Sequence, residues 1–148
     1  TNTLIVFAGG GSDERELKNR VPDNLLGNIL ITGTLEHAML LSYMSLADLV
    51  VIPSLSEGFG ITLVESMMLK RNVISSDAGG LKETIHGSNA IEWFTCGNAA
   101  VLQQKLTTFF AGELSFQPEK AYAYYRANFS PEAYREALLQ YLNHTLPA

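Results

Sequence analysis

The sequence predicts an α/β fold in which a mostly parallel sheet carries helices on both faces. Short apolar runs, typical of strands in a buried parallel sheet, alternate along the chain with stretches of helical spacing. Turns that contain glycine or proline separate the two kinds of segment. Alternation of this kind implies right-handed crossovers between parallel strands. The 148 residues suffice for one core, so we expect residues 1–148 to form a single domain.

Each element follows from a local pattern. Residues 4–8 form a continuous apolar run, which predicts a buried strand, and Ser12 or Asp13 can cap the helix that follows. Ser130 before Pro131 predicts the start of the last helix. The remaining strands are predicted at 28–32, 49–52, 72–75 and 90–94, and the helices at 13–20, 36–46, 61–69, 79–85, 98–110, 118–127 and 131–143.

The composition narrows the classes of function. A net charge of −5 gives no sign of a nucleic-acid-binding surface, so we expect no nucleic-acid partner. The single cysteine, Cys96, excludes an internal disulfide and fits a reducing compartment. No apolar run approaches the ~20 residues of a transmembrane helix, and no basic segment precedes the first apolar run as in a signal peptide. These features predict a cytoplasmic, globular protein.

The most informative segment places two carboxylates around a glycine-rich turn. Glu57 and Glu65 flank Gly58-Phe59-Gly60, and this turn joins the predicted strand 49–52 to the predicted helix 61–69. The start of a helix offers unpaired backbone N–H groups and a positive dipole end, which together bind phosphate. Two acids beside an anion site indicate a ligand with hydroxyl groups on both sides of its phosphates. A nucleotide sugar has this chemistry.

These residues resemble a known family. The Glu57–Glu65 spacing is similar to the Glu-x7-Glu signature of the retaining, GT-B-fold group 1 glycosyltransferases. The neighbouring segments extend the resemblance along nearly the whole chain: 47–54 is similar to the family's "ADvfvlPS", 73–83 to its "PVIasdvGGlpE", and 33–35 to its Gly-x-hydrophobic loop. The resemblance implies a Rossmann-like domain that forms the C-terminal, donor-binding half of a GT-B enzyme, and a role in polysaccharide biosynthesis.

The resemblance also implies roles for individual residues. Glu57 is the catalytic candidate and would bind hydroxyls of the transferred sugar, whereas Glu65 would bind the ribose. The simpler interpretations are a solvated loop acid for Glu57 and an ordinary first-turn acid for Glu65. The other expected donor-binding residues are backbone positions: Gly58, Phe59, Gly60, Ile61 and Thr62 at the phosphates and sugar, Gly79 and Gly80 at the sugar, and Leu35 at the base.

The family pattern implies further parts that this sequence does not contain. The domain would lack its first strand and helix, which carry an Arg and a Lys for the diphosphate, and also the N-terminal acceptor domain. We therefore expect the isolated chain to be inactive, and any peripheral contact with the inner face of the membrane to come from the absent domain. We expect no metal and no cofactor beyond the nucleotide-sugar co-substrate. His37, His86 and His144 have no metal-ligand spacing.

One departure from the family pattern concerns the end of the helix that carries Glu65. The usual Gly and Pro are replaced by Lys70 and Asn72, and we expect Asn72 to adopt the left-handed conformation of a helix cap.

Two alternative functions stay open on the sequence. The chain could form half of a GT-B-fold nucleotide-sugar epimerase, which would need a different set of acids and histidines. It could also be a stand-alone sugar-nucleotide-binding subunit that pairs with a separate acceptor subunit, as a reading frame beginning near Thr1 would indicate.

Overall fold

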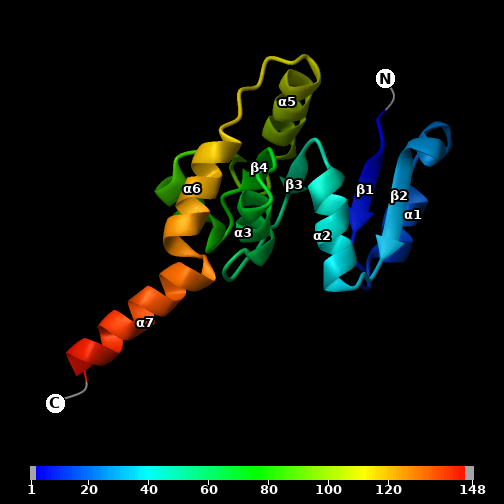
Figure 1. Ribbon diagram of the computed structural model, residues 1–148. Helices are drawn as coiled ribbons and strands as arrows, with labels where there is room; N and C mark the ends of the chain where they lie inside the picture. Colours follow the sequence, from blue (N-terminus) through cyan, green and yellow to red (C-terminus); the bar gives the residue numbers. More distant parts are fainter. Residues whose placement is uncertain (1–2, 146–148) are drawn as a thin grey trace. The chain divides into compact units, whose positions relative to one another are not determined.

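The computed structural model describes residues 3–145. The chain divides into two compact units, Thr1–Tyr43 and Met44–Ala148. Each unit contains a small parallel sheet, with the strand order β1-β2 in the first and β3-β4-β5 in the second. Figure 1 labels β1 and β2 of the first sheet and β3 and β4 of the second. The predicted α/β class with parallel strands and intervening helices is therefore confirmed, and its strands are distributed over two sheets.

The first unit is built around one parallel pair of strands. Strand β1 (Ile5–Ala8) pairs with β2 (Ile29–Gly33), and the register is interrupted between Phe7 and Ala8. Two short helical segments lie between them in sequence, the α-helix α1 (Glu14–Arg20) and the 3₁₀ helix η1 (Asp23–Asn28). The strand expected at 4–8 is present, but the prediction that it is buried is wrong, because Ile5 is 47% and Phe7 39% exposed.

Glycines shape the turn that leaves β1. The amide of Gly9 donates to the carbonyl of Gly33 at 3.1 Å, and a Cβ on Gly10 would lie 2.4 Å from the hydroxyl of Thr34. The turn therefore packs against the end of β2. Helix α1 follows without the predicted side-chain cap: Asp13 precedes it but caps no amide, and the Ser12 hydroxyl donates to the Asp13 carboxylate instead. Helix α2 (His37–Leu46) then runs across the division between the units.

The second unit contains the remaining elements. Strands β3 (Val50–Ile52), β4 (Val73–Ser76) and β5 (Glu92–Phe94) are parallel, with β4 in the centre. The helices are α3 (Ile61–Met68), α4 (Leu81–Ser88), α5 (Ala99–Phe110), α6 (Pro118–Asn128) and α7 (Pro131–Thr145). Each of these strands and helices lies where the sequence predicts one, and most bounds differ by one to three residues.

The core of the second unit lies where α3, α4 and α6 meet the sheet. Leu63 and Met67 of α3 and Leu81 of α4 are completely buried, and Ala121 of α6 packs with them. Helix α6 runs beside α3 (Figure 1), and the small Ala121 side chain allows this close approach. The candidate functional site lies at the starts of α3 and α4, so the packing of this core holds these two helices in place.

The end of α3 differs from the prediction. Lys70, and not Asn72, takes the left-handed conformation, with φ 55°. The amide of Arg71 donates to the carbonyl of Ser66 at 2.9 Å, which is the long hydrogen bond of a Schellman cap, and this register places the left-handed residue at position 70. The Asn72 side chain instead donates to the carbonyl of Asp48 at 3.0 Å.

The predicted cap of the last helix is confirmed and gives a test of stability. Ser130 is 1% exposed, and its hydroxyl accepts from the amide of Ala133 at 3.2 Å and donates to the carbonyl of Arg126 at 2.7 Å.

Ser130→Ala is expected to lower the free energy of unfolding by about 1–2 kcal/mol, because one buried side chain satisfies the ends of two helices. Chemical denaturation measures the change. The exposed Ser115 is the control, and Ser115→Ala should shift stability by less than about 0.5 kcal/mol; equal values for the two variants would contradict the prediction.

Candidate functional site

The turn between β3 and α3 is the centre of the candidate site. Glu57 lies on this turn and is half-buried, whereas Gly58 and Phe59 are exposed. Gly60 ends the turn with φ 84° and ψ 51°, a left-handed conformation that glycine adopts without strain. A Cβ at this position would also lie 2.4 Å from a methyl carbon of Leu81. Gly60 thus aims the chain into α3 and lets the turn approach α4.

The backbone amides around the start of α3 have no acceptor within residues 3–145, although Gly60 itself is buried. The amides of Leu63 and Val64 donate to the carbonyl of Gly60 at 2.9 and 3.2 Å. The amides that precede them, at 59–62, donate to no other residue in the described range 3–145. Ile61 is 64% exposed and Thr62 is also exposed. Unpaired N–H groups at the exposed start of a helix attract anions through hydrogen bonds and the helix dipole.

The glycine pair at 79 and 80 lets a second loop pack against this turn. A Cβ on Gly79 would lie 2.1 Å from the carbonyl oxygen of Glu57, and one on Gly80 would lie 2.1 Å from that of Gly58. The amide of Gly80 donates to the carbonyl of Glu57 at 3.0 Å. Contact between two backbones therefore calls for glycine at both positions, and Gly79 also has the left-handed φ of 48° that glycine adopts without strain. Their expected contact with a sugar stays a prediction.

The two carboxylates have different surroundings. The Glu57 carboxylate makes no hydrogen bond or ion pair within the part of the chain that the structure describes. Glu65 is half-buried and is the fifth residue of α3. The interpretation of Glu65 as an ordinary first-turn acid is therefore wrong, because the benefit of a negative charge near the helix dipole is confined to the first turn.

Polar groups from β4 and from the loop after β5 hold the site turn, and sequence reasoning missed them. The Ser76 hydroxyl donates to the carbonyl of Ser54 at 2.7 Å, and the Cys96 thiol donates to that of Leu55 at 3.3 Å. The Asp77 carboxylate accepts from the amide of Cys96 at 2.7 Å. The sequence feature that could have indicated these groups is the run of polar residues 75–77, which ends a predicted strand that begins with apolar residues.

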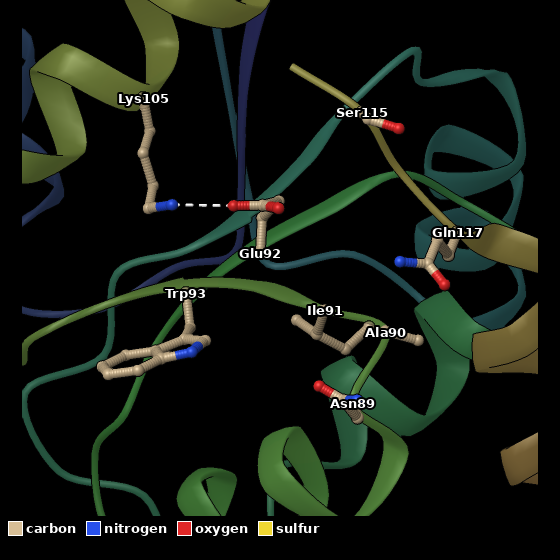
Figure 2. Close-up of a pocket in the computed structure, with 8 residues that line it drawn as sticks. All are labelled: Asn89, Ala90, Ile91, Glu92, Trp93, Lys105, Ser115 and Gln117. Carbon is tan, nitrogen blue, oxygen red and sulfur yellow. Dashed lines mark hydrogen bonds and ion pairs between the residues drawn. The ribbon is translucent and has the colours of Figure 1, made fainter.

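A separate cavity of about 430 Å³ lies at the amino end of β5, whereas the turn described above follows the carboxyl end of β3. Its lining includes Glu92 and Lys105, whose side chains form an ion pair at 2.7 Å (Figure 2). Trp93 and Gln117 also line it. None of the residues expected to bind a ligand lines this cavity.

Comparison with known families shows the family to which this chain belongs. The sequence profile of the family described as "Glycosyl transferases group 1" matches residues 1–136. The chain belongs to the group 1 glycosyl transferases. The family match covers the turn between β3 and α3 as well as the loop at 79–80, so the site lies within the part that group 1 glycosyl transferases share.

Individual relatives agree with this assignment. The chain is 33% identical to the alpha-D-kanosaminyltransferase of Streptomyces kanamyceticus over 82 residues, which are 55% of this chain and 21% of that protein. It is 29% identical to the putative teichuronic acid biosynthesis glycosyltransferase TuaC of Bacillus subtilis over 116 residues, which are 78% of this chain and 28% of that protein. The chain thus spans about a quarter of these relatives.

Solved structures show the same fold. The crystal structure of Anabaena Alr3699/HepE in complex with UDP superposes with a TM-score of 0.81 at 20% sequence identity. The superposition covers 96% of this chain and 41% of that one. The predicted fold, one half of a GT-B architecture with Rossmann-like topology, is therefore confirmed for a group 1 glycosyl transferase.

The structure places most of the predicted site residues of this group 1 glycosyl transferase in one unit. Glu57 to Thr62, Glu65, Gly79 and Gly80 all lie on the turn, on α3 or on the loop before α4. Leu35 lies in the first unit, in the loop after β2. Within residues 3–145, no helix is long and apolar enough to cross a membrane, and no group of three or more His, Cys, Asp or Glu side chains is arranged to hold a metal ion.

Proposed function

We propose that this chain is the donor-binding part of an enzyme that moves a sugar from a nucleoside-diphosphate sugar to an acceptor hydroxyl with retention of configuration. The observation that carries the proposal is the exposed start of α3, where the amides at 59–62 have no acceptor in the described chain, beside the unpartnered carboxylate of Glu57. The family membership supports sugar transfer as the reaction.

The proposed roles follow from the chemistry of each group. The diphosphate lies at the amides of 59–62, where hydrogen bonds and the helix dipole stabilise its negative charge as it leaves. The Glu57 carboxylate accepts hydrogen bonds from hydroxyls of the transferred sugar, and Glu65 accepts from the ribose. Gly58 has open space above its Cα, so a ligand can approach the backbone there. No step in this scheme calls for a metal ion.

The proposal extends to parts outside this chain. We propose that the acceptor binds to a separate domain and that the enzyme acts in polysaccharide biosynthesis in the cytoplasm, at or near the inner face of the membrane. The relative TuaC is named for teichuronic acid biosynthesis, which supports a polymeric acceptor.

A calorimetric screen tests the proposed function. The chain is titrated with the diphosphates of uridine, guanosine and adenosine and with their glucose or mannose derivatives. The expected result is weak binding of one base series, with a measurable gain from the sugar. No binding of any of these compounds at millimolar concentration would overturn the assignment of a donor site to this chain.

Glu65→Ala is expected to weaken binding of the preferred nucleoside diphosphate about tenfold to a hundredfold. A hydrogen bond to a charged group contributes about 1.5–3 kcal/mol, and this change removes the carboxylate that we assign to the ribose. Titration calorimetry of the two proteins measures the effect. Glu83→Ala is the matched control, because it removes an exposed acid from the first turn of α4 that has no assigned donor contact. Equal affinities for the Glu65 variant and the wild type would refute the ribose assignment.

We also expect no sugar transfer from this chain by itself. The chain spans 41% of the HepE structure, and the proposed reaction needs an acceptor held against the donor. An assay with radiolabelled donor and an acceptor mixture should give no labelled product. Transfer at a rate above that of donor hydrolysis would contradict this expectation.

A further inference from the structure

The segment that carries Glu57 is held by its backbone carbonyls. The carbonyl of Ser54 accepts from the Ser76 hydroxyl at 2.7 Å, and the carbonyl of Leu55 accepts from the Cys96 thiol at 3.3 Å. The carbonyl of Glu57 accepts from the amide of Gly80 at 3.0 Å. Three donors from other parts of the second unit therefore fix residues 54–57, while the Glu57 carboxylate has no partner in the described chain.

Among these donors, Ser76 has the firmest support. Its side chain is completely buried, and it ends β4, the central strand, which is paired on one side with β3 and on the other with β5. A thiol is a weak donor, so the bond from Cys96 contributes less than the bond from a hydroxyl. The third donor, Gly80, lies on a loop that itself packs against the turn. The Ser76 hydroxyl is therefore the strongest side-chain donor to the segment 54–57 in the described chain.

A change at Ser76 is transmitted to Glu57 over a short distance. Ser54 and Glu57 are three residues apart, and no regular element lies between them. Without the hydroxyl, the half-buried carbonyl of Ser54 keeps only the weak Cys96 thiol, at 3.7 Å, as a donor in the described chain, so the segment should shift or admit water to satisfy it. A shift of about 1 Å in a group that contacts the substrate is enough to lower the rate of a reaction about a hundredfold.

We propose that Ser76 is a positioning residue that sets the place of the Glu57 carboxylate through the carbonyl of Ser54. The proposal rests on the proposed function, because it assumes that Glu57 contacts the sugar of the donor. Ser76 itself is buried below the turn and touches no ligand in this scheme. Its loss should therefore affect the recognition of the sugar and leave the recognition of the nucleoside diphosphate intact.

The neighbouring serine provides a matched control. Ser75 is also completely buried on β4, but its hydroxyl donates to the carbonyl of Ser76 at 3.0 Å, within the strand. Ser75→Ala and Ser76→Ala remove the same atom from adjacent buried positions. A merely structural role would give the two variants the same properties.

The first arm of the experiment needs no ligand. Hydrogen exchange of the Gly80 amide reports whether the segment holding Glu57 stays in place, because this amide donates to the Glu57 carbonyl. In Ser76→Ala we expect exchange at Gly80 to be about tenfold faster than in Ser75→Ala. Equal exchange in the two variants, compared at equal global stability, would overturn the proposal.

The second arm uses UDP and UDP-glucose as probes. The Kd for UDP divided by the Kd for UDP-glucose isolates the contribution of the sugar. Ser76→Ala should lower this ratio at least about fivefold, and it should change the affinity for UDP less than about threefold. Ser75→Ala should leave the ratio unchanged.

In a Glu57→Gln background Ser76→Ala should have no further effect, because it acts through Glu57. An unchanged ratio in Ser76→Ala, or an equal loss in the Glu57→Gln background, would overturn the proposal. Failure of the wild type to bind either probe would instead count against the proposed function, and the exchange measurement would then decide whether Ser76 holds the segment.

Discussion

Replacement of Gly80 by alanine is expected to lower the free energy of unfolding by about 3 kcal/mol. The backbone angles of Gly80, φ −64° and ψ −18°, suit any residue, so the cost is purely steric. The new Cβ would lie 2.1 Å from the carbonyl oxygen of Gly58 and 3.2 Å from the Cα of Phe59. Both contacts are with backbone, which cannot rotate away as a side chain can. The loop before α4 must therefore separate from the site turn.

Thermal unfolding followed by circular dichroism measures this effect. For a chain of this size, a loss of about 3 kcal/mol corresponds to a melting temperature lower by about 6–12 °C. Exchange of the amide at position 80 with solvent should accelerate as well, because its hydrogen bond to the Glu57 carbonyl is lost. An unchanged melting temperature would mean that the two loops are not packed as described.

Gly58→Ala is the matched control for this variant. A Cβ on Gly58 meets nothing within 4 Å, and its φ lies outside the left-handed region. Stability should therefore change by less than about 0.5 kcal/mol. If a donor approaches the backbone at Gly58 as proposed, the same variant should bind a nucleoside diphosphate sugar more weakly although it is fully folded. The pair of variants separates a glycine needed by the fold from one available to a ligand.

The sequence was sufficient to predict the fold because the deciding signals are local. The apolar run at 49–52, the glycines of the turn and the helical spacing at 61–69 lie next to one another in the chain, and each limits the next. The strand at 4–8 was also predicted correctly from a local run, but the prediction that it is buried was wrong, because burial depends on what packs against the strand from elsewhere.

The details that were missed depend on contacts between distant residues. Nothing near Ser76 in the sequence shows that its hydroxyl bonds to Ser54, 22 residues earlier. The same holds for Gly79 and Gly80, whose glycine identity reflects contact with the backbone of Glu57 and Gly58. The left-handed conformation of Lys70 was missed for a different reason. Asparagine tolerates this conformation better than lysine, which favoured Asn72. The hydrogen bond from the Arg71 amide to the Ser66 carbonyl nevertheless sets the register of the helix cap and places the left-handed residue at position 70.

Glu57→Gln is expected to have the largest effect on the proposed reaction. In an enzyme that joins this domain to its acceptor-binding partner, the rate of sugar transfer should fall about 10²–10³-fold, the range seen when one electrostatic contact to a transition state is removed. Glutamine keeps the size of glutamate and one acceptor oxygen, but it loses the charge and replaces the second oxygen by an NH2 donor. The fold should be unaffected, because the Glu57 carboxylate has no partner within residues 3–145 and the segment is held by its carbonyls.

Affinity for the bare nucleoside diphosphate separates this role from a role in the phosphate site. Glu57 lies on the turn before α3 and Glu65 lies within α3, so the start of the helix, where the phosphates are proposed to bind, is between them in the chain. Glu57→Gln should therefore change the affinity for the diphosphate less than about threefold, or ~0.7 kcal/mol. A large loss of rate with little loss of nucleotide affinity means that the contact is made mainly in the transition state. Loss of nucleotide binding in Glu57→Gln would show that this acid supports the phosphate site, and the division of roles between the two carboxylates would then be wrong even within the same family.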